Sequence, residues 1–414
     1  MTDDAHADIT SHDTYVNDVP HATFSRLRRE DPVSWWDEAD GKGFWALTKH
    51  ADCLAAVRDY KTFTSTKGIR LEDMSEEETE ARRTIMEMDP PEHTRLRNLL
   101  GRGFSPKVVA TYEQRIREIA TDLIETAAQH DSFDFVKSIA RPLPMRMLGR
   151  LLGVPDDDGG MLVDLGDMMI ANTDPDFTDH VVDQVDTEEF RLLPFRSPAA
   201  RKVFKYADEQ ARQRREQPTD DIISVLLSPI PGREPLSDLE FKNFFALMVA
   251  AGNDTTRYTM TYAIKALIDR PGLIEELRQA DAALWKTAVE EFLRWGSVTM
   301  HFRRTAARDV TMHGRDIKEG DKVAIWFISA NRDEDEFASP FELDIRRTPN
   351  RHVTFGRSGP HTCLGMWLAR LEIRVMLQEF IKRARSIEQT GPEARLRSNF
   401  ITGIKKLPVS VNWA

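Results

Sequence analysis

The sequence predicts a mainly α-helical fold with a small β region, organised as a single domain over residues 1–414. Apolar residues recur with the 3.6-residue period of helices over most of residues 91–384. Residues 33–48 and 303–328 instead show short apolar runs bounded by turn residues, which is typical of strands. No internal repeat, low-complexity linker or Pro-rich hinge divides the chain, so one mixed, helix-rich domain is the simplest organisation.

The first ninety residues are expected to combine strands with a helix. Residues 33–36 and 43–48 are predicted strands, and residues 50–59 are a predicted helix. Residues 64–88 are charged and irregular, which favours a solvated loop with a short helix. Residues 1–19 begin with a polar, acidic stretch, and we expect them to form a loosely ordered segment.

Long helices dominate the rest of the chain. They are predicted at residues 108–129, 138–152, 199–215, 236–269 and 364–385. The longest begins with a capping-box pattern, in which Ser237 is the N-cap and Glu240 lies three residues later. It ends at Pro271 and Gly272, which cannot continue a regular helix.

The segment between the last two of these helices changes character. Residues 303–328 are predicted strands with turns at His313-Gly314 and Glu319-Gly320. Residues 331–350 are loop-like and lead into a glycine-containing loop at residues 355–363.

The composition excludes several classes of protein. The formal net charge is −11 and no basic stripe is present, which argues against a nucleic-acid-binding role. The chain start lacks the basic and apolar regions of a signal peptide, and the longest apolar run, residues 244–251, is too short to span a bilayer. We therefore expect a cytoplasmic protein without a membrane anchor.

One of the two cysteines, Cys363, lies in a sequence context that makes it a candidate thiolate ligand. Cys53 belongs to an amphipathic helical pattern and is expected in the core. Cys363 follows a loop with glycines at 356 and 359 and precedes a long helix, whose free N–H groups stabilise a thiolate. No second cysteine lies nearby for zinc, and no CxxCH motif attaches a c-type haem. The loop alone leaves open a thiolate ligand or a merely buried cysteine.

Three further patterns are ambiguous when taken singly. Residues 250–256 place an acid and two hydroxyls after Gly252 in the centre of an apolar helix, which fits either a proton-relay groove or an ordinary kink. Glu291 and Arg294 share a helix face and could form a surface ion pair. His93 and Arg97 also share a face, which suits a carboxylate or phosphate ligand or a solvated basic surface.

Together these patterns resemble the cytochrome P450 family in residue identity and in chain order. The order is His-x-x-x-Arg at residue 93, Ala-Gly-x-Asp-Thr-Thr at residue 251, Glu-x-x-Arg at residue 291 and then the Cys363 loop. The resemblance covers about residues 20–413. It implies a triangular, helix-rich domain that encloses haem b between the long central helix and the helix after Cys363.

The resemblance implies a role for each matching position. Cys363 would ligate the iron, and Asp254 and Thr255 would supply protons for oxygen activation. Glu291, Arg294 and Arg347 would have a structural role around the cysteine loop. The other residues expected at the haem are His93, Arg97, Ala251, Gly252, Arg304, Phe355, His361 and Gly365. The residues expected at the substrate are Leu247, Val298, Met300, Phe302 and Ile401.

The implied function is a monooxygenase that hydroxylates an apolar fatty acid, sterol side chain or terpenoid with O₂. The loop from Phe355 to Cys363 is one residue longer than the commonest family pattern, and it looks like the variant in bacterial hydroxylases of sterol side chains and methyl-branched lipids. No dinucleotide motif is present, so electrons are expected from a ferredoxin and its reductase on the proximal face, where arginines such as Arg102, Arg357 and Arg370 could steer it. A peroxide-using haem-thiolate enzyme and a non-catalytic haem sensor are the alternatives, and neither needs a proton relay.

Overall fold

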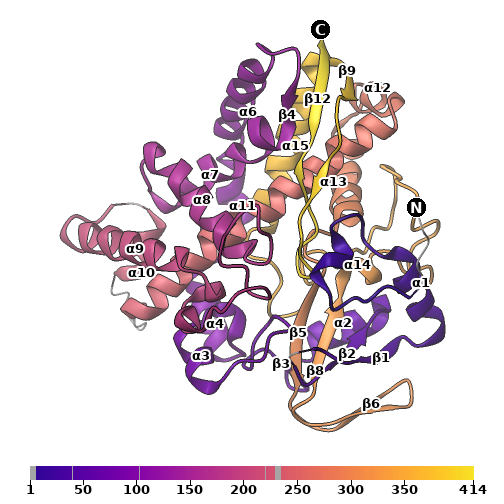
Figure 1. Cartoon of the computed structure of the whole chain (residues 1–414). Coiled ribbons are helices and arrows are strands. Elements are labelled where there is room, and N and C mark those ends of the chain that lie inside the picture. Colours follow the sequence, from indigo (N-terminus) through magenta and orange to yellow (C-terminus); the bar gives the residue numbers. More distant parts are fainter. Residues whose placement is uncertain (1–5, 40, 102, 220, 229–234) are drawn as a thin grey trace.

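The computed structural model describes residues 6–39, 41–101, 103–219, 221–228 and 235–414. It is mainly helical with small β-sheets, so the predicted fold class is confirmed (Figure 1). The organisation as one domain stays a prediction. No helix among the described residues is long and apolar enough to cross a membrane.

Helices are the main secondary-structure elements of the described chain. They are α1 (His21–Glu30), α2 (His50–Arg58), α3 (Glu76–Ala81), α4 (Glu92–Leu100), α5 (Pro106–Ala110), α6 (Glu113–Ala127), α7 (Pro142–Leu152), α8 (Gly159–Ile170), α9 (Ala199–Glu216), α10 (Ile222–Leu227), α11 (Asp238–Asp269), α12 (Gly272–Arg278), α13 (Ala282–Gly296), α14 (Phe327–Ala330) and α15 (Met366–Arg383). The longest, α11, begins with the predicted capping box, because Ser237 Oγ accepts from Glu240 N and the Glu240 side chain accepts from Ser237 N.

The largest sheet joins strands from both halves of the chain. Its order is β1 (Val33–Trp36), β2 (Phe44–Leu47), β8 (Lys322–Trp326), β5 (His301–Ala306) and β3 (Phe63–Thr64). The smaller sheets are β4 (Phe133–Asp134) with β12 (Pro408–Trp413) and β9 (Ala384–Gln389), β10 (Ala394–Arg395) with β11 (Ile404–Lys406), and β6 (Val310–Met312) with β7 (Arg315–Ile317).

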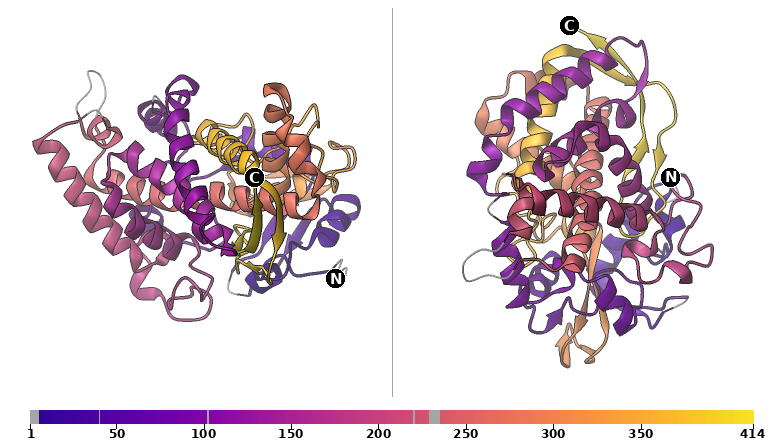
Figure 2. Two further views of the ribbon diagram at one scale, coloured as in Figure 1. Left: turned by 90° about the horizontal axis from the view of Figure 1, so that it is seen from above. Right: turned by 90° about the vertical axis from the view of Figure 1, so that its left-hand side faces the viewer.

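Helix α11 crosses the middle of the molecule and organises it. Helices α7, α8 and α9 pack on it from one side, and α13 and α15 pack on it from another. Figure 1 and the two views of Figure 2 show α7–α10 gathered at one side of α11 and the large sheet at the other. The two largest groups of buried apolar residues both include side chains of α11, so this helix lies between them.

The hairpin of β6 and β7 lies at the lower edge of Figure 1. Strand pairing ends at Met312 and Arg315, which leaves His313 and Gly314 as a two-residue turn. Both turn residues have positive φ angles, 47° and 74°, as this type of tight hairpin turn requires. The predicted turn is therefore confirmed.

Two predicted helices are divided in the structure, and in each case one of the resulting helices begins at a proline. Residues 108–129 contain the end of α5, which begins at Pro106 and is capped by Ser105, and then α6. In residues 138–152, a π-helical turn at Val136–Ala140 precedes α7, which begins at Pro142. Proline lacks an N–H and is tolerated in the first turn of a helix, so it marks a start that the apolar period does not show.

The prediction that residues 1–19 are loosely ordered is wrong for residues 6–19. Ile9 and Tyr15 are buried, with exposed fractions of 0% and 2%. The Arg397 guanidinium binds the Asp13 carboxylate, and His12 Nδ1 accepts from the Asn399 backbone N–H at 3.0 Å. A distant C-terminal partner therefore orders this segment, although its local sequence is polar.

Candidate functional site

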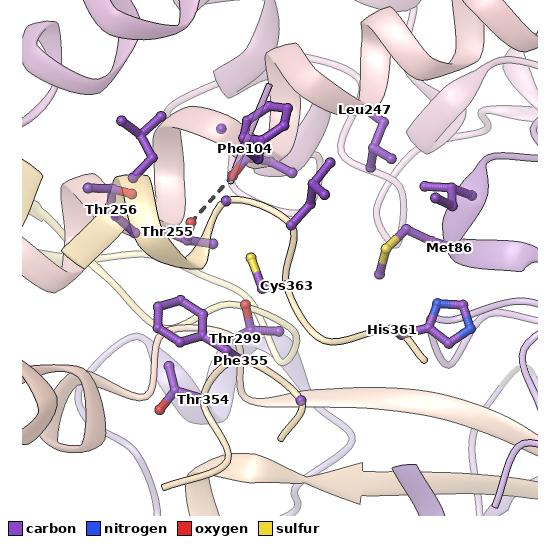
Figure 3. A pocket seen from close by; sticks show the side chains of 18 of the residues that line it. Met86, Phe104, Leu247, Thr255, Thr256, Thr299, Thr354, Phe355, His361 and Cys363 are labelled. Atoms are coloured by element: carbon purple, nitrogen blue, oxygen red, sulfur yellow. Dashed lines mark hydrogen bonds between the residues drawn. The ribbon is translucent and has the colours of Figure 1, made fainter. Parts of the chain in front are cut away.

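A cavity lies where α4, α11, α15, the start of β5 and the loop before α15 meet. Its lining includes Arg97 from α4, Thr255 from α11, Phe302 from β5, Cys363 from the loop and Glu372 from α15. Figure 3 shows the Cys363 sulfur pointing into this space, with Thr255 above it and Phe355 below. Segments far apart in the sequence therefore meet around one cysteine.

Backbone contacts fix the loop that carries Cys363. The Cys363 N–H donates to the Phe355 carbonyl at 2.8 Å, and the Thr362 hydroxyl donates to the Gly359 carbonyl at 2.7 Å. Gly356 has a φ of +66°, a conformation that favours glycine. A Cβ on Gly359 would lie 2.2 Å from the Val57 carbonyl oxygen, so only glycine fits there.

The groups around the Cys363 sulfur shift the pKa of its thiol in opposite directions. Its side chain is exposed only in the sense that it faces the cavity rather than bulk solvent. Burial raises the pKa of the thiol, while the Gly365 N–H, the Arg97 and Arg370 guanidinium groups and the Met366 N–H lower it. The N–H groups at the start of α15 therefore lower the pKa of the thiol as predicted, but burial raises this pKa by more.

Four basic side chains line the cavity near this loop: His93, Arg97, Arg304 and His361. The two imidazole rings lie 4.3 Å apart, and His361 Nε2 is 2.9 Å from Ser65 Oγ. Burial and Arg97 lower the pKa of His93 to about 4, and burial and Arg304 lower that of His361 to about 2.

The two arginines of this group have no counter-ion in the described part of the chain, whereas the low pKa values of His93 and His361 leave both imidazoles neutral at pH 7. Arg304 donates to the Arg303 carbonyl at 2.7 Å, yet no carboxylate lies within ion-pair distance of either Arg97 or Arg304 among the described residues. Burial lowers even the pKa of Arg304, to about 10. Buried cationic groups without anions are destabilising, so this cluster favours an anionic ligand.

The α11 wall of the cavity contains three of the four residues predicted there. Ala251, Gly252 and Thr255 line the cavity, and the Thr255 hydroxyl donates to the Ala251 carbonyl at 3.3 Å. A Cβ on Gly252 would lie 2.9 Å from a methyl group of Leu148, so glycine allows α7 to approach α11 closely. Thr256 and Thr259 also line the cavity and were not predicted.

The fourth residue, Asp254, does not line the cavity. Its side chain is only 1% exposed, and Asp254 Oδ1 accepts from Arg257 Nη2 at 2.8 Å. Arg257 Nη1 also donates to both carboxylate oxygens of Asp167 on α8, at 2.9 and 3.1 Å. Successive helical residues point about 100° apart, so Asp254 and Thr255 face different neighbours. Asp254 therefore points away from the cavity that Thr255 lines, and the proton-supplying role expected of both residues stays a prediction.

Burial dominates the electrostatics of this Asp254 cluster. It raises the pKa of Asp254, an effect that Arg257 opposes and Asp167 strengthens. Arg141 donates to Asp167 at 2.9 Å and thereby extends the cluster toward the surface of α8. The cluster connects α8 with α11 behind the cavity wall.

Three of the five predicted substrate residues line the cavity: Leu247, Val298 and Phe302. Met300 does not, because its side chain is fully buried among the core residues around Trp326. Ile401 does not either, because it packs in the core with Phe400. The neighbouring Thr299 lines the cavity instead, and its backbone pairs with that of Ile401.

The Glu291–Arg294 pair is buried rather than at the surface. Both side chains are 0% exposed, and two hydrogen bonds of 2.8 and 2.7 Å join them. Arg294 also donates to the Asn331 carbonyl at 2.9 Å, and Arg347 Nε donates to Glu291 at 3.2 Å. The three predicted structural residues are thus brought together, and they hold residues 331–347 beside α13.

A second ion-pair group near the loop was missed by the sequence analysis. Arg370 makes hydrogen bonds of 2.6 and 2.8 Å to Glu290, and its guanidinium lies 4.6 Å from the centre of the Phe355 ring. His352 Nε2 is 2.9 Å from the same carboxylate. Burial alone would raise the pKa of Glu290, but Arg370 and His352 lower it to about 2. This group connects α13, α15 and the cysteine loop.

The comparisons with known proteins give the same result over nearly the whole chain. The family model described as Cytochrome P450 matches residues 18–412. The methyl-branched lipid omega-hydroxylase of Mycobacterium tuberculosis is 36% identical over 403 residues, covering 95% of this chain and 91% of that protein. The steroid C26-monooxygenase of Mycolicibacterium smegmatis is 33% identical and covers 96% of this chain and 91% of its own length.

Solved structures agree with this result. A Mycobacterium marinum cytochrome P450 in complex with pseudoionone has a TM-score of 0.85 at 34% identity and covers 94% of each chain. A Bacillus megaterium enzyme of the same family in complex with testosterone has a TM-score of 0.83 at 28% identity, covering 95% of this chain and 98% of that one.

Proposed function

Since the chain belongs to the cytochrome P450 family of haem-thiolate monooxygenases, we propose that it hydroxylates an apolar, lipid-like substrate with electrons from a ferredoxin. The observation that carries this proposal is a single cysteine sulfur opening into a largely apolar cavity. A fatty acid, a sterol side chain or a terpenoid fits such walls, and the names of the relatives point to the same classes. The reaction is R–H + O₂ + two electrons + two protons to R–OH + water.

The residues around the cavity fit haem b, the cofactor that this family binds through a cysteine thiolate. Cys363 would hold the iron. The guanidinium groups of Arg97 and Arg304 and the neutral imidazoles of His93 and His361 would bind the two haem carboxylates. Phe355 and Gly365 would border the ring on the cysteine side, and Ala251 and Gly252 on the α11 side. Bound there, the haem iron supplies the oxygen-activating chemistry.

The apolar walls would orient the substrate and exclude water. Leu247 projects from α11 and Phe302 from β5, while Val298 lies in the segment between α13 and β5. With few polar anchors, these side chains select by shape and by burial of apolar surface. An apolar substrate that fills the space displaces water from the place where oxygen is activated.

Thr255 would hold a proton on the α11 side of the cavity. Its hydroxyl faces the cavity and, among the described residues, hydrogen bonds only to the Ala251 carbonyl, so it can also bond to a ligand or water. Asp254 would act on this site only indirectly, because its carboxylate binds Arg257 away from the cavity.

The electrons would come from a ferredoxin that docks near α15, in the cytoplasm. The expected patch of arginines near α15 has less net positive charge than its arginine content suggests. Arg370 is paired with Glu290, and Arg374 is paired with Glu113. Arg102 lies outside the described residues. Arg357 has no carboxylate within ion-pair distance in the described part of the chain. Reduction by ferredoxin should therefore slow as salt rises, and Arg357→Glu should slow it without changing substrate affinity.

Turnover tests this proposal against its two alternatives. Purified holoenzyme would be supplied with NADH, a ferredoxin and its reductase, or with peroxide alone, and screened with fatty acids, sterols and terpenoids. Product from the NADH system supports a monooxygenase, product from peroxide alone supports a peroxide-using enzyme, and no product from either supports a sensor. Reduced, carbonmonoxy wild-type protein should show the red-shifted Soret band of thiolate ligation, and Cys363→Ser should lose it.

A further inference from the structure

Arg70, in the segment between β3 and α3, has a guanidinium group with an incomplete set of partners. Its Nη2 atom donates to Asn172 Oδ1 at 3.1 Å, but its buried Nη1 atom has no hydrogen-bond partner among the described residues. No ion pair joins Arg70 to a carboxylate in the described part of the chain. Burial lowers the pKa of this group, yet an arginine stays charged at neutral pH. A positive charge with an unsatisfied buried donor favours an anionic ligand.

The acids that follow Arg70 in the sequence are bound by other cations. Glu72 accepts from Arg82 Nη1 at 3.1 Å, and Asp73 accepts from Lys322 Nζ at 3.1 Å. The charges of Glu72 and Arg82 shift the pKa of Arg70 in opposite directions, so each offsets part of the other. The Nη1 donor of Arg70 therefore remains available to an acceptor that is not part of these pairs.

Aromatic rings connect Arg70 with the wall of the cavity. Its guanidinium carbon lies 5.0 Å from the centre of the Phe400 ring and 5.7 Å from that of Phe195. The Phe400 ring in turn lies 5.6 Å from the ring of Phe302, which lines the cavity. Arg70 itself does not line the cavity. Its positive charge is therefore held one aromatic ring beyond the cavity wall, on the Phe302 side.

His301 on β5 is a second polar group at the Phe400 ring that lacks partners. The two ring centres lie 5.5 Å apart. His301 is 1% exposed, and neither of its ring nitrogens has a hydrogen-bond partner among the described residues. Burial and the charge of Arg70 lower its pKa to about 3, so the imidazole is neutral at pH 7 and carries one N–H that can donate. Two side chains at one ring thus offer donors without acceptors.

We propose that the substrate is an apolar carboxylic acid whose carboxylate binds Arg70, an inference that rests on the proposed monooxygenase function. The carboxylate would accept a charge-assisted hydrogen bond from Nη1 and could accept another from His301. The Phe302 and Phe400 rings rotate to let the chain pass, a side-chain change that is common at binding sites. A fatty acid or another lipid acid is therefore preferred over a neutral sterol or terpenoid.

The position of Arg70 also determines which end of such an acid is oxidised. Cys363 lies in the cavity, whereas the carboxylate at Arg70 is held beyond the cavity wall. The apolar chain extends from Arg70 past Phe302 toward the cysteine side. Hydroxylation is therefore expected at a carbon far from the carboxyl group.

The first test compares acids with their neutral esters on the wild-type and Arg70→Met holoenzymes. The ligands are decanoic, tetradecanoic and hexadecanoic acid, each with its methyl ester, at neutral pH where the acids are ionised. Dissociation constants would come from equilibrium dialysis and from the Soret shift. At least one acid should bind the wild type about tenfold more tightly than its ester. In Arg70→Met this ratio should fall to about one, while ester affinity and haem content stay unchanged.

Two further variants separate a binding role of Arg70 from a structural one. Arg70→Lys keeps the positive charge and should restore part of the preference for acids. Arg201→Met removes another guanidinium that lies 5.0 Å from a phenylalanine ring, that of Phe190, but this one is paired with Glu189 at 2.9 Å. It should keep the wild-type ratio of acid to ester affinity. An arginine that only supports the fold would instead weaken acid and ester binding equally when replaced.

The products give a second readout with NADH, ferredoxin and its reductase. The wild type should hydroxylate the preferred acid near the end remote from its carboxyl group, and Arg70→Met should spread hydroxylation over more carbons. Equal affinity of the wild type for every acid and its ester, or an unchanged ratio in Arg70→Met, would overturn the inference. Failure of the proposed function looks different, because no substrate would then yield product although the preference for acids persisted in dialysis.

Discussion

At the scale of single residues, Gly359 decides whether the cysteine loop can close. A Cβ there would meet the Val57 backbone, with 2.2 Å to the carbonyl oxygen and 3.0 Å to the carbonyl carbon. Backbone atoms cannot rotate away, so Gly359→Ala should displace the loop, with a cost of about 1–3 kcal/mol. We expect less bound haem and a lower unfolding temperature. Gly272→Ala is the control, since nothing lies within 4 Å of its added Cβ.

Replacement of Thr255 should leave ligand binding intact but impair the reaction. The Thr255→Ala variant should keep haem and substrate but divert reducing equivalents to peroxide, because the hydroxyl facing the cavity is gone. The measurement is product formed per NADH. Thr261→Ala serves for comparison, because the Thr261 hydroxyl bonds to the Arg257 carbonyl within α11 and does not line the cavity. Full coupling in Thr255→Ala would remove this residue from proton handling.

Sequence patterns locate site residues well where the local backbone alone sets the direction of a side chain. They locate them poorly where packing against distant residues sets that direction. The i,i+3 spacing of Glu291 and Arg294 was enough to predict their contact, but not their complete burial, which depends on residues 331–347. Glu372 was not predicted because α15 carries several charged residues, and the sequence alone does not show which of them faces solvent and which faces a cavity. Its helical spacing from Leu368 was the available signal.

At the scale of elements, the buried Glu291–Arg294 pair holds α13 against the loop before the cysteine. Glu291→Ala should leave the Arg294 guanidinium buried without its carboxylate, at a cost of about 3–5 kcal/mol. We expect insoluble or haem-free protein in expression tests. Glu275→Ala removes a pair with the same spacing on α12, where the Glu275 side chain is 61% exposed, and should leave the unfolding temperature unchanged. Soluble, haem-replete Glu291→Ala protein would contradict this prediction.

The Glu290 group predicts that acid pH destabilises the same region. The pKa of Glu290 is lowered to about 2, so the carboxylate stabilises the fold above its usual pKa of 4.5. That contribution should disappear as pH falls from about 4.5 toward 2, because the folded protein must then protonate Glu290 and lose its bonds to Arg370 and His352. Thermal unfolding of Glu290→Gln should show a smaller loss of stability across this pH range than the wild type.

The element boundaries show the limits of periodicity. The helices predicted at residues 199–215 and 236–269 agree closely with α9 and α11, because each has a clear start and stop. Helix α8 was not predicted, since two adjacent glycines at its start hide its beginning. The cavity itself joins residues more than 250 positions apart, and no local pattern specifies such contacts.

At the scale of the whole molecule, the N-terminal segment is part of the fold. Tyr15 is 2% exposed, and its hydroxyl donates to the Ile9 carbonyl at 3.0 Å. Tyr15→Ala should therefore cost about 3–5 kcal/mol, the range for deleting a buried aromatic ring. Tyr15→Phe loses only the hydrogen bond and should cost about 1 kcal/mol. Chemical denaturation of the two variants measures the difference, and equal stabilities would mean that the ring contributes nothing.

The hairpin of β6 and β7 also makes the protein suitable for engineering. Its tip consists of His313 and Gly314 alone. His313 Nε2 lies 3.0 Å from Asp52, and Arg315 on the stem forms an ion pair with Asp31. No residue of this hairpin lines the cavity. An affinity tag, a fluorophore or a tethered electron donor inserted between the two turn residues would therefore leave the haem pocket undisturbed.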